Sequence, residues 1–252
     1  MILLHYHLFK NAGTSVDAML KANFGEAWVE QEFETRGSES NCDAVRQFLV
    51  ERPHIKALSS HTALMPVPEI ESVEIFPILF VRHPILRLKS AYAFESKQDA
   101  DTHGARLARS TDFSGYISAM LEQENATQAW NFQTTRLAYC HCGGSDVPLE
   151  RAQNALRQLP FVGLVEEYVL SIDILVAKLK PHIHDFEPLL ARKNATSDGS
   201  ESVTARIAAI QTELGDALFE RLVRANFADL AIYYTIADRY LKIAAEQKTD
   251  SG

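Results

Sequence analysis

The sequence has no long apolar run and no stretch of biased composition. None of its apolar segments approaches 18 uninterrupted residues, so no transmembrane helix is expected. The apolar residues at the N-terminus have no basic region ahead of them, which is unlike a signal peptide. The 252-residue chain also lacks internal repeats, low-complexity segments and an obvious linker. These absences predict one domain over residues 1–252, long enough for a sizeable core.

Cysteine is scarce, and basic residues are fewer than acidic ones. The three cysteines are an odd number and suggest no disulfide framework. Cys140 and Cys142, with His141 between them, resemble half of a zinc site, but no second pair has ligand spacing, so we expect no metal. The formal net charge of −8 favours a soluble protein and argues against nonspecific binding to nucleic acid.

The clearest positive feature is an apolar run that enters a tight loop and then a helix. The run opens at Ile2, breaks at residues 10–15, and is followed by apolar residues at helical spacing from Val16. The N–H groups at the start of a helix attract anions. In the loop, Gly13 permits close approach of a ligand, and the other side chains add a charge and hydroxyl donors. We therefore predict a phosphate cradle made of Lys10, Asn11, Ala12, Gly13, Thr14 and Ser15.

The position of the lysine separates this loop from nucleoside-triphosphate cradles. Those cradles place Lys after the glycines and directly before Ser or Thr, whereas Lys10 precedes Gly13, the only glycine of the loop, by three residues. The order His7-x-x-Lys10-x-Ala12-Gly13-Thr14-Ser15 resembles the 5′-phosphosulfate loop of the carbohydrate branch of sulfotransferases, which commonly reads His-Ile-Pro-Lys-Thr-Ala-Gly-Thr-Ser. The departures, Phe9 for Pro and Asn11 for Thr, remove neither a charge nor a glycine.

A second motif follows the apolar strand predicted over residues 75–82. It runs Arg82-His83-Pro84-x-x-Arg87-x-x-Ser90-x-Tyr92 and resembles the 3′-phosphate motif of the same family. The resemblance implies that Arg82 and Ser90 bind the 3′-phosphate of 3′-phosphoadenosine-5′-phosphosulfate (PAPS), whereas we expect Arg87 and Lys89 to be solvated. Kinases often end such a strand in an Asp that holds Mg²⁺, so an arginine there suits a metal-free sulfuryl transfer.

Three later stretches extend the resemblance over nearly the whole chain. They are residues 131–137, residues 161–168 followed by Ser171, and Asp229 with Tyr233 or Tyr234. The resemblance implies an α/β fold of the P-loop kinase type, with a central parallel sheet, helices on both faces and a helix-rich C-terminal half. It also implies PAPS as sulfuryl donor and a hydroxyl-bearing acceptor such as a carbohydrate. Many animal members carry a membrane anchor ahead of the first strand; none precedes it here, so we expect a cytoplasmic, prokaryotic enzyme.

Hydrophobic periodicity predicts the remaining elements. Further strands are expected over residues 55–60 and 161–165, and the polar composition of residues 23–40 predicts a loop. Asn41 is the expected N-cap of a short helix that ends at Pro53. Further helices are expected over residues 113–121, 126–138, 149–159, 167–180 and 226–247, with disorder from about residue 246. The last helix has an apolar face of Phe227, Leu230, Tyr234, Ala237, Leu241 and Ala244.

The general base and the acceptor site are left open by the sequence. His61 ends a predicted strand at the edge where the cradle lies, and a histidine at the matching place is the base in the resembled uronyl 2-O-sulfotransferases. Glu95 is the second choice for the base, although an exposed helix charge is our preferred interpretation of it. His5, His7 and His83 are interpreted as core histidines. Arg136, with Arg106 and Arg109, forms either an acceptor wall or a solvated surface. A nucleotide or small-molecule kinase and a non-catalytic nucleotide-binding protein are the alternative functions.

Overall fold

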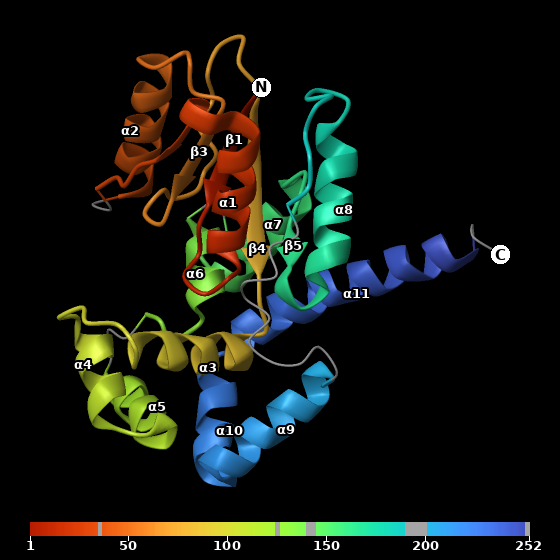
Figure 1. Cartoon of the computed structure of the whole chain (residues 1–252). Helices are drawn as coiled ribbons and strands as arrows, with labels where there is room; N and C mark the ends of the chain where they lie inside the picture. Colours follow the sequence, from red (N-terminus) through yellow and green to blue (C-terminus); the bar gives the residue numbers. More distant parts are fainter. Residues whose placement is uncertain (35–36, 124–126, 140–144, 190–200, 250–252) are drawn as a thin grey trace.

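A computed structural model describes residues 1–34, 37–123, 127–139, 145–189 and 201–249. Its sheet has five parallel strands in the order β2-β3-β1-β4-β5, which confirms the α/β prediction (Figure 1). The strands are β1 (Ile2–Tyr6), β2 (Trp28–Glu30), β3 (Ala57–Ser60), β4 (Ile75–Val81) and β5 (Gly163–Leu164). Because all strands run the same way, their carboxyl ends share one edge of the sheet.

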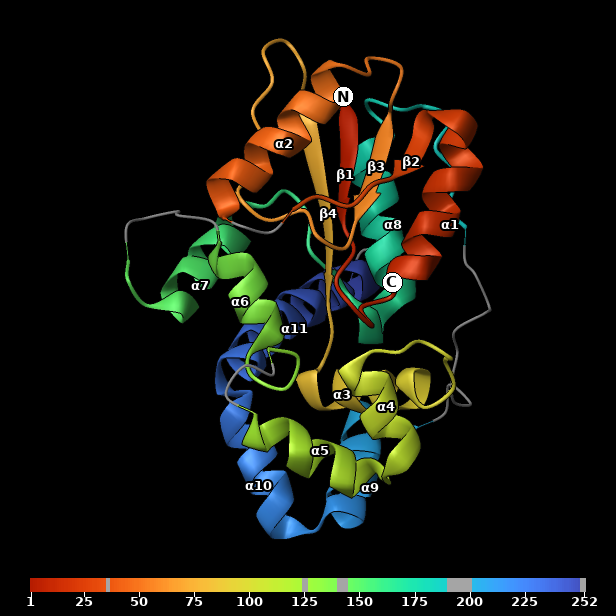
Figure 2. The ribbon, with the colours of Figure 1, turned by 90° about the vertical axis from the view of Figure 1, so that its left-hand side faces the viewer.

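Helices cover both faces of the sheet, as the alternating strands and helices predict. Side chains alternate along β1, so Leu3 packs toward one face and Leu4 toward the other. Helices α1 (Gly13–Phe24) and α8 (Tyr168–Leu179) cover the Leu3 face. The Leu4 face is covered by α2 (Ser38–Val50), α6 (Phe132–Ala138), α7 (Pro148–Gln158) and α11 (Phe227–Thr249), as Figure 2 shows for α2 and α7.

A group of helices below the carboxyl edge of the sheet forms its own hydrophobic cluster. We call it the helical lobe, and in both views it lies beneath the ends of β1 and β4 (Figures 1 and 2). It consists of α3 (Pro84–Glu95), α4 (His103–Ser110), α5 (Phe113–Glu122), α9 (Val203–Leu214) and α10 (Asp216–Ala225). Asp112, one of two residues before α5 whose type suits an N-cap, caps this helix, and its carboxylate accepts from the N–H of Gly115. No helix in the described part of the chain is long and apolar enough to cross a membrane.

The segment 23–40 is not the loop that its polar composition suggests. It contains a 3₁₀ turn (Gly25–Ala27), the edge strand β2 and the start of α2. Asn41 is therefore inside α2 and does not cap it. Its buried side chain donates to the carbonyls of Glu34 and Thr62 and accepts from the N–H of Leu64, so it fastens α2 to the chain after β3.

The C-terminal helices also differ in detail from the sequence prediction. Helix α6 begins only at Phe132, and α11 continues to Thr249, past the residue from which disorder was expected. The predicted apolar face of α11 is not the buried one. Phe227, Tyr234 and Leu241 are exposed, whereas Ile232, Tyr233, Ile236 and Tyr240 pack on the sheet. Residues 192–200, whose polar composition predicts a loop, lie outside the described residues.

Candidate anion-binding site

The predicted cradle lies where the strand order of the sheet reverses. From β1 the chain passes to β2 and β3 on one side and then to β4 and β5 on the other. Ligands of open α/β sheets bind in the crevice beyond the carboxyl ends of the strands at such a switch point. The loop of residues 7–12 connects β1 to α1 at this point, so the topology places the predicted residues in a ligand-binding crevice.

The cradle loop has an unusual backbone that buried contacts hold in place. Lys10 and Ala12 have left-handed φ values of 64° and 63°, and Asn11 between them does not. Such alternation turns successive N–H groups toward a common point, an arrangement that binds anions. The buried side-chain amide of Asn11 donates to the carbonyl of Phe80 (2.8 Å) and to Oε1 of Gln133 (2.7 Å). These two bonds fix the loop against β4 and α6.

Gly13, the first residue of α1, is required by a close contact. A Cβ atom at this position would lie 2.0 Å from Cδ2 and 2.1 Å from Nε2 of His7. The glycine therefore lets the imidazole pack directly on the start of the helix. The N–H groups of Ser15 and Val16 donate to the carbonyl of Ala12, so the earlier N–H groups of the helix are those left to face a ligand.

Arg82 and Lys10 are neighbours at the carboxyl edge. The guanidinium of Arg82 donates from Nη1 to the backbone carbonyl of Lys10 at 3.0 Å. Burial lowers the pKa of the half-buried Lys10 ammonium, and the positive charge of Arg82 lowers it further. The ammonium also lies 4.4 Å from the ring centroid of Phe94. Two cations so close together favour an anion between or beside them.

The surroundings of Arg82 include charges that the sequence did not single out. Burial lowers the pKa of Arg82, while Glu166, with its Oε1 3.9 Å from Nε of Arg82, raises it. The N–H of His83 donates to the Glu166 carboxylate. Burial, helped by the charge of Arg206 on α9, lowers the pKa of His83 to about 4, so His83 is neutral at pH 7. Arg206 is thus a third cation near this edge, brought by the helical lobe.

Gln133 joins the two predicted loops to the C-terminal helix. Its Oε1 accepts from the N–H of Arg82 (2.8 Å), and its Nε2 donates to the carbonyl of Arg82 (2.8 Å). The buried carboxylate of Asp229 accepts from the N–H groups of Gln133 and Thr134. The side chain of Asn131 accepts from the first-turn N–H groups of α11. The motif over residues 131–137 therefore supports the site and does not line it.

His61 lies at the same edge, held by a carboxylate and by another histidine. Its Nδ1 is 2.9 Å from Oε1 of Glu32 and 3.8 Å from Oε1 of Glu30. Its ring stacks on His7 with centroids 3.8 Å apart and an interplanar angle of 27°. Burial raises the pKa of Glu32, but hydrogen bonds from Thr62 and His61 outweigh it and leave this pKa below its ordinary value. With Nδ1 engaged by the carboxylate, Nε2 is the atom of His61 left for a substrate.

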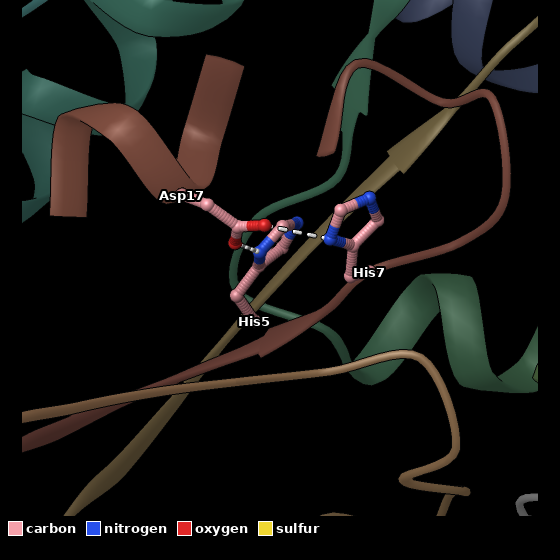
Figure 3. A group of neighbouring side chains, drawn as sticks. All are labelled: His5, His7 and Asp17. Carbon is pink, nitrogen blue, oxygen red and sulfur yellow. Dashed lines mark hydrogen bonds and ion pairs between the residues drawn. The ribbon is translucent and has the colours of Figure 1, made fainter. Parts of the chain in front are cut away.

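His7 belongs to a polar cluster beneath the cradle. His5 and His7 point to the α1 face of the sheet, where Asp17 reaches both of them (Figure 3). The Nδ1 atoms lie 2.8 Å (His5) and 2.7 Å (His7) from the two carboxylate oxygens. Ser59, the register partner of His5, lies 3.2 Å from its Nδ1 and accepts from the indole N–H of Trp28. His7 is thus a largely buried histidine, as expected, and its Nδ1 contacts a carboxylate without the geometry of a hydrogen bond.

Two groups near the cradle have the residue types of a metal site. In each, the potential ligand atoms lie within 4.8 Å of one another; the groups are His5, His7 and Asp17, and Glu30, Glu32 and His61. Direct contacts of 2.7–2.9 Å already pair the histidines with carboxylates in both groups. The expectation of no metal therefore stays a prediction. Cys140 and Cys142 lie outside the described residues.

Glu95 and Arg87 are buried, contrary to the exposed positions expected for them. Glu95 is only 4 % exposed and accepts from the hydroxyl of Tyr116 at 2.5 Å. Arg87 is fully buried, donates to the carbonyl of Gln128 and lies over the ring of Phe132. Sequence periodicity missed both because their partners come from other segments of the chain. Lys89 is partly exposed and pairs with Glu213 of α9.

Glu95 lies at the wall of a cavity beside Lys10. The cavity has a volume of about 390 Å³, and its walls include Phe9, Phe94, Glu95, Gln98, His103 and Gln123. Phe9 and Phe94 pack edge to face, and Phe94 also contacts the Lys10 ammonium, so the cavity adjoins the cradle. No lysine or arginine is among the described residues that line it.

The three arginines proposed for an acceptor wall are not together. Arg106 pairs with Asp101, and Arg109 donates to the carbonyls of Gln98 and Ala100, so both are held within the helical lobe. Arg136 instead lies near Glu32: burial lowers its pKa, and the negative charge of Glu32 is among the groups that raise it. Ser90 lies half-buried on α3, two turns after Arg82.

The fold and the site define a parallel α/β protein in which Lys10 and Arg82 meet at the switch point of the sheet. No family model matches the chain. An uncharacterized protein of the archaeon Archaeoglobus fulgidus is 35 % identical over 246 residues, a match that covers 95 % of this chain and 97 % of that protein. The chain belongs to the same family as this archaeal protein.

Proposed function

We propose that this protein is a PAPS-dependent sulfotransferase with a fold of the P-loop kinase type. The observation that carries the proposal is the pairing of Lys10 with Arg82 at the start of α1. This site concentrates two cations and the first N–H groups of a helix where a phosphosulfate would bind. The buried Nε of Arg82 has no hydrogen-bond partner among the described residues, as expected of a donor that completes its bonding with an anion.

The proposed transfer assigns roles to six of the predicted residues. The N–H groups at Gly13 and Thr14 would hold the 5′-phosphate, and Arg82 and Ser90 the 3′-phosphate. As the acceptor oxygen forms a bond to sulfur, the bond from sulfur to the bridging oxygen breaks, and adenosine 3′,5′-bisphosphate leaves. Lys10 would stabilise the negative charge that develops on the leaving phosphate. The acceptor proton passes to Nε2 of His61, whose Nδ1 is held by Glu32.

The cavity beside Lys10 supports an uncharged hydroxyl-bearing acceptor, such as a neutral sugar. Its amide side chains Gln98 and Gln123 can bond hydroxyls, and Phe9 and Phe94 offer apolar ring surface. Glu95 adds a carboxylate, which repels acidic sugars. Because Arg106 and Arg109 are engaged elsewhere, a cationic wall for an acidic acceptor is not supported.

The test is turnover with sulfur-labelled PAPS against panels of neutral sugars, acidic sugars, lipids and phenols. We expect labelled product from a hydroxyl acceptor, with neutral sugars preferred. Transfer of phosphate from ATP, or nucleotide binding without any turnover, would favour one of the two alternatives, a kinase or a non-catalytic relative.

A further inference from the structure

The side chain of His61 is held by two contacts, and one of them, the stack on His7, has no role in the proposed reaction. It is 40 % exposed, so an unsupported ring would be free to rotate. Glu32 fixes its Nδ1 from one side, and the ring of His7 stacks on its face, with the centroids 3.8 Å apart and the ring planes inclined by 27°. Of these two contacts, the stack sets the plane of the imidazole. The direction of Nε2 therefore depends on where His7 lies.

His7 is itself fixed at both edges. Its Nδ1 lies 2.7 Å from a carboxylate oxygen of Asp17, which projects from α1 toward the strand (Figure 3). Its opposite edge packs on Gly13, where even a methyl group would overlap the ring. The imidazole can therefore neither swing toward the helix nor leave the carboxylate without breaking a contact. The ring of His7 is a rigid platform under His61.

Asp17 is anchored by the sheet. Its other oxygen lies 2.8 Å from Nδ1 of His5, a residue of β1 that is 1 % exposed. Burial alone would raise the pKa of Asp17, but its contacts with His5 and His7 outweigh this effect and hold this pKa below its ordinary value. The carboxylate is therefore ionised at neutral pH. A continuous set of contacts runs from β1 through Asp17 and His7 to His61.

We propose that Asp17 and His7 are positioning residues that orient His61 toward the acceptor. The inference rests on the proposed function, in which His61 is the base. In this role His7 acts through its flat ring and takes no proton from the acceptor. A base misplaced by about 1 Å loses up to roughly a hundredfold in rate. The position that the His7 ring gives to His61 should therefore have a large effect on kcat.

The structural part of the proposal is tested by proton NMR of the histidine rings in the full-length chain. In the wild type, the ring protons of His61 carry a ring-current shift from His7. His7→Ala should abolish this shift, and His7→Phe should keep one because phenylalanine supplies a flat ring of similar size. His54→Ala, which removes an exposed histidine before β3, is the control and should change nothing. An unchanged His61 signal in His7→Ala would overturn the proposal.

The functional part is tested by turnover of PAPS and by binding of adenosine 3′,5′-bisphosphate. His7→Ala should lower kcat by about ten- to a hundredfold, since the base is misplaced. His7→Phe should recover most of that loss, and both should bind the bisphosphate about as tightly as the wild type. Equal losses of kcat in His7→Phe and His7→Ala would show that a nitrogen of His7 is needed and would overturn the positioning role.

Asp17→Asn provides a second variant in case His7→Ala does not fold. The amide keeps the size of the carboxylate but turns an N–H₂ group toward one of the two histidines. We expect a smaller His61 ring-current shift and a reduced kcat with unchanged KM for PAPS. An unaltered shift would contradict the proposal. Because the NMR measurement needs no PAPS, a wild-type chain that shows the stack but never transfers sulfate would overturn the proposed function alone.

Discussion

The guanidinium of Arg82 donates a hydrogen bond to the backbone carbonyl of Lys10, although the two residues are 72 positions apart in the chain. This contact joins the two loops that the sequence identifies separately, one after β1 and one after β4. It also gives Arg82 a second role, because the same side chain that would bind a 3′-phosphate stabilises the left-handed backbone of Lys10.

Replacement of Lys10 should affect chemistry more than binding. Lys10→Ala should lower kcat by about 10²–10³-fold, the usual cost of removing one donor that stabilises charge in the transition state. Affinity for adenosine 3′,5′-bisphosphate should fall much less. Lys21→Ala, an exposed lysine in the last turn of the same helix, is the matched control and should behave as the wild type. A Lys10→Ala variant that loses binding but keeps its turnover per bound complex would contradict the assigned role.

Replacement of Arg82 should distinguish nucleotides by their 3′-phosphate. Arg82→Ala should weaken adenosine 3′,5′-bisphosphate by about 1.5–3 kcal/mol more than it weakens adenosine 5′-monophosphate, the range for a hydrogen bond to a charged group. A smaller loss common to both ligands is expected because Arg82 also holds the cradle loop. Titration calorimetry measures both losses. Arg46→Ala, an exposed arginine of α2, is the control, and equal losses for both ligands in Arg82→Ala would make Arg82 purely structural.

Removal of His61 should abolish base catalysis. His61→Ala should lower kcat by about 10²–10⁴-fold, the usual contribution of a general base, and leave the affinity for PAPS nearly unchanged. Steady-state kinetics with a good acceptor provides the measurement. If the variant folds, binds PAPS and keeps a near-normal kcat, the base lies elsewhere, and the buried carboxylate of Glu95 in the neighbouring cavity is the next residue to replace.

A methyl group at Gly13 should disturb both stability and the cradle. In Gly13→Ala the new Cβ would overlap the His7 ring, so the ring or the helix must shift. We expect a loss of about 1–3 kcal/mol in the free energy of unfolding, as for other overpacked sites, together with weaker nucleotide binding. Gly37→Ala is the control, since its Cβ would lie 3.5 Å from its nearest neighbour. Chemical denaturation compares the two variants, and equal stabilities would show that the contact at Gly13 is loose.

The sequence predicts best the parts of the site that depend on neighbours in the chain. Strand β1, the cradle loop and the start of α1 follow one another, and so do β4, Arg82 and α3, so apolar runs and turn residues were enough to place them. The shared edge of a parallel sheet then brought Lys10, Arg82 and His61 to the same end of the molecule.

What the sequence did not predict depends on contacts between distant segments. Glu95 looked exposed because its partner Tyr116 belongs to another helix. Asn41 looked like a cap because Thr62 and Leu64, which bind its side chain, follow a later strand. Helix α11 has apolar residues on two faces, and periodicity alone does not say which of them meets the sheet. No sequence pattern indicated a role for Asp17, because the two histidines that it contacts lie on β1 and in the loop after it, not on its own helix.

The most direct test of the central claim is titration calorimetry of the wild-type chain with adenosine 3′,5′-bisphosphate and with ATP, each in Mg²⁺ and in EDTA. A sulfotransferase should bind the bisphosphate with the same affinity in both buffers, since Lys10 and Arg82 supply the positive charge. ATP should bind more weakly in both. Tight binding of ATP that needs Mg²⁺, or loss of bisphosphate binding in EDTA, would contradict a metal-free PAPS site at the end of β1.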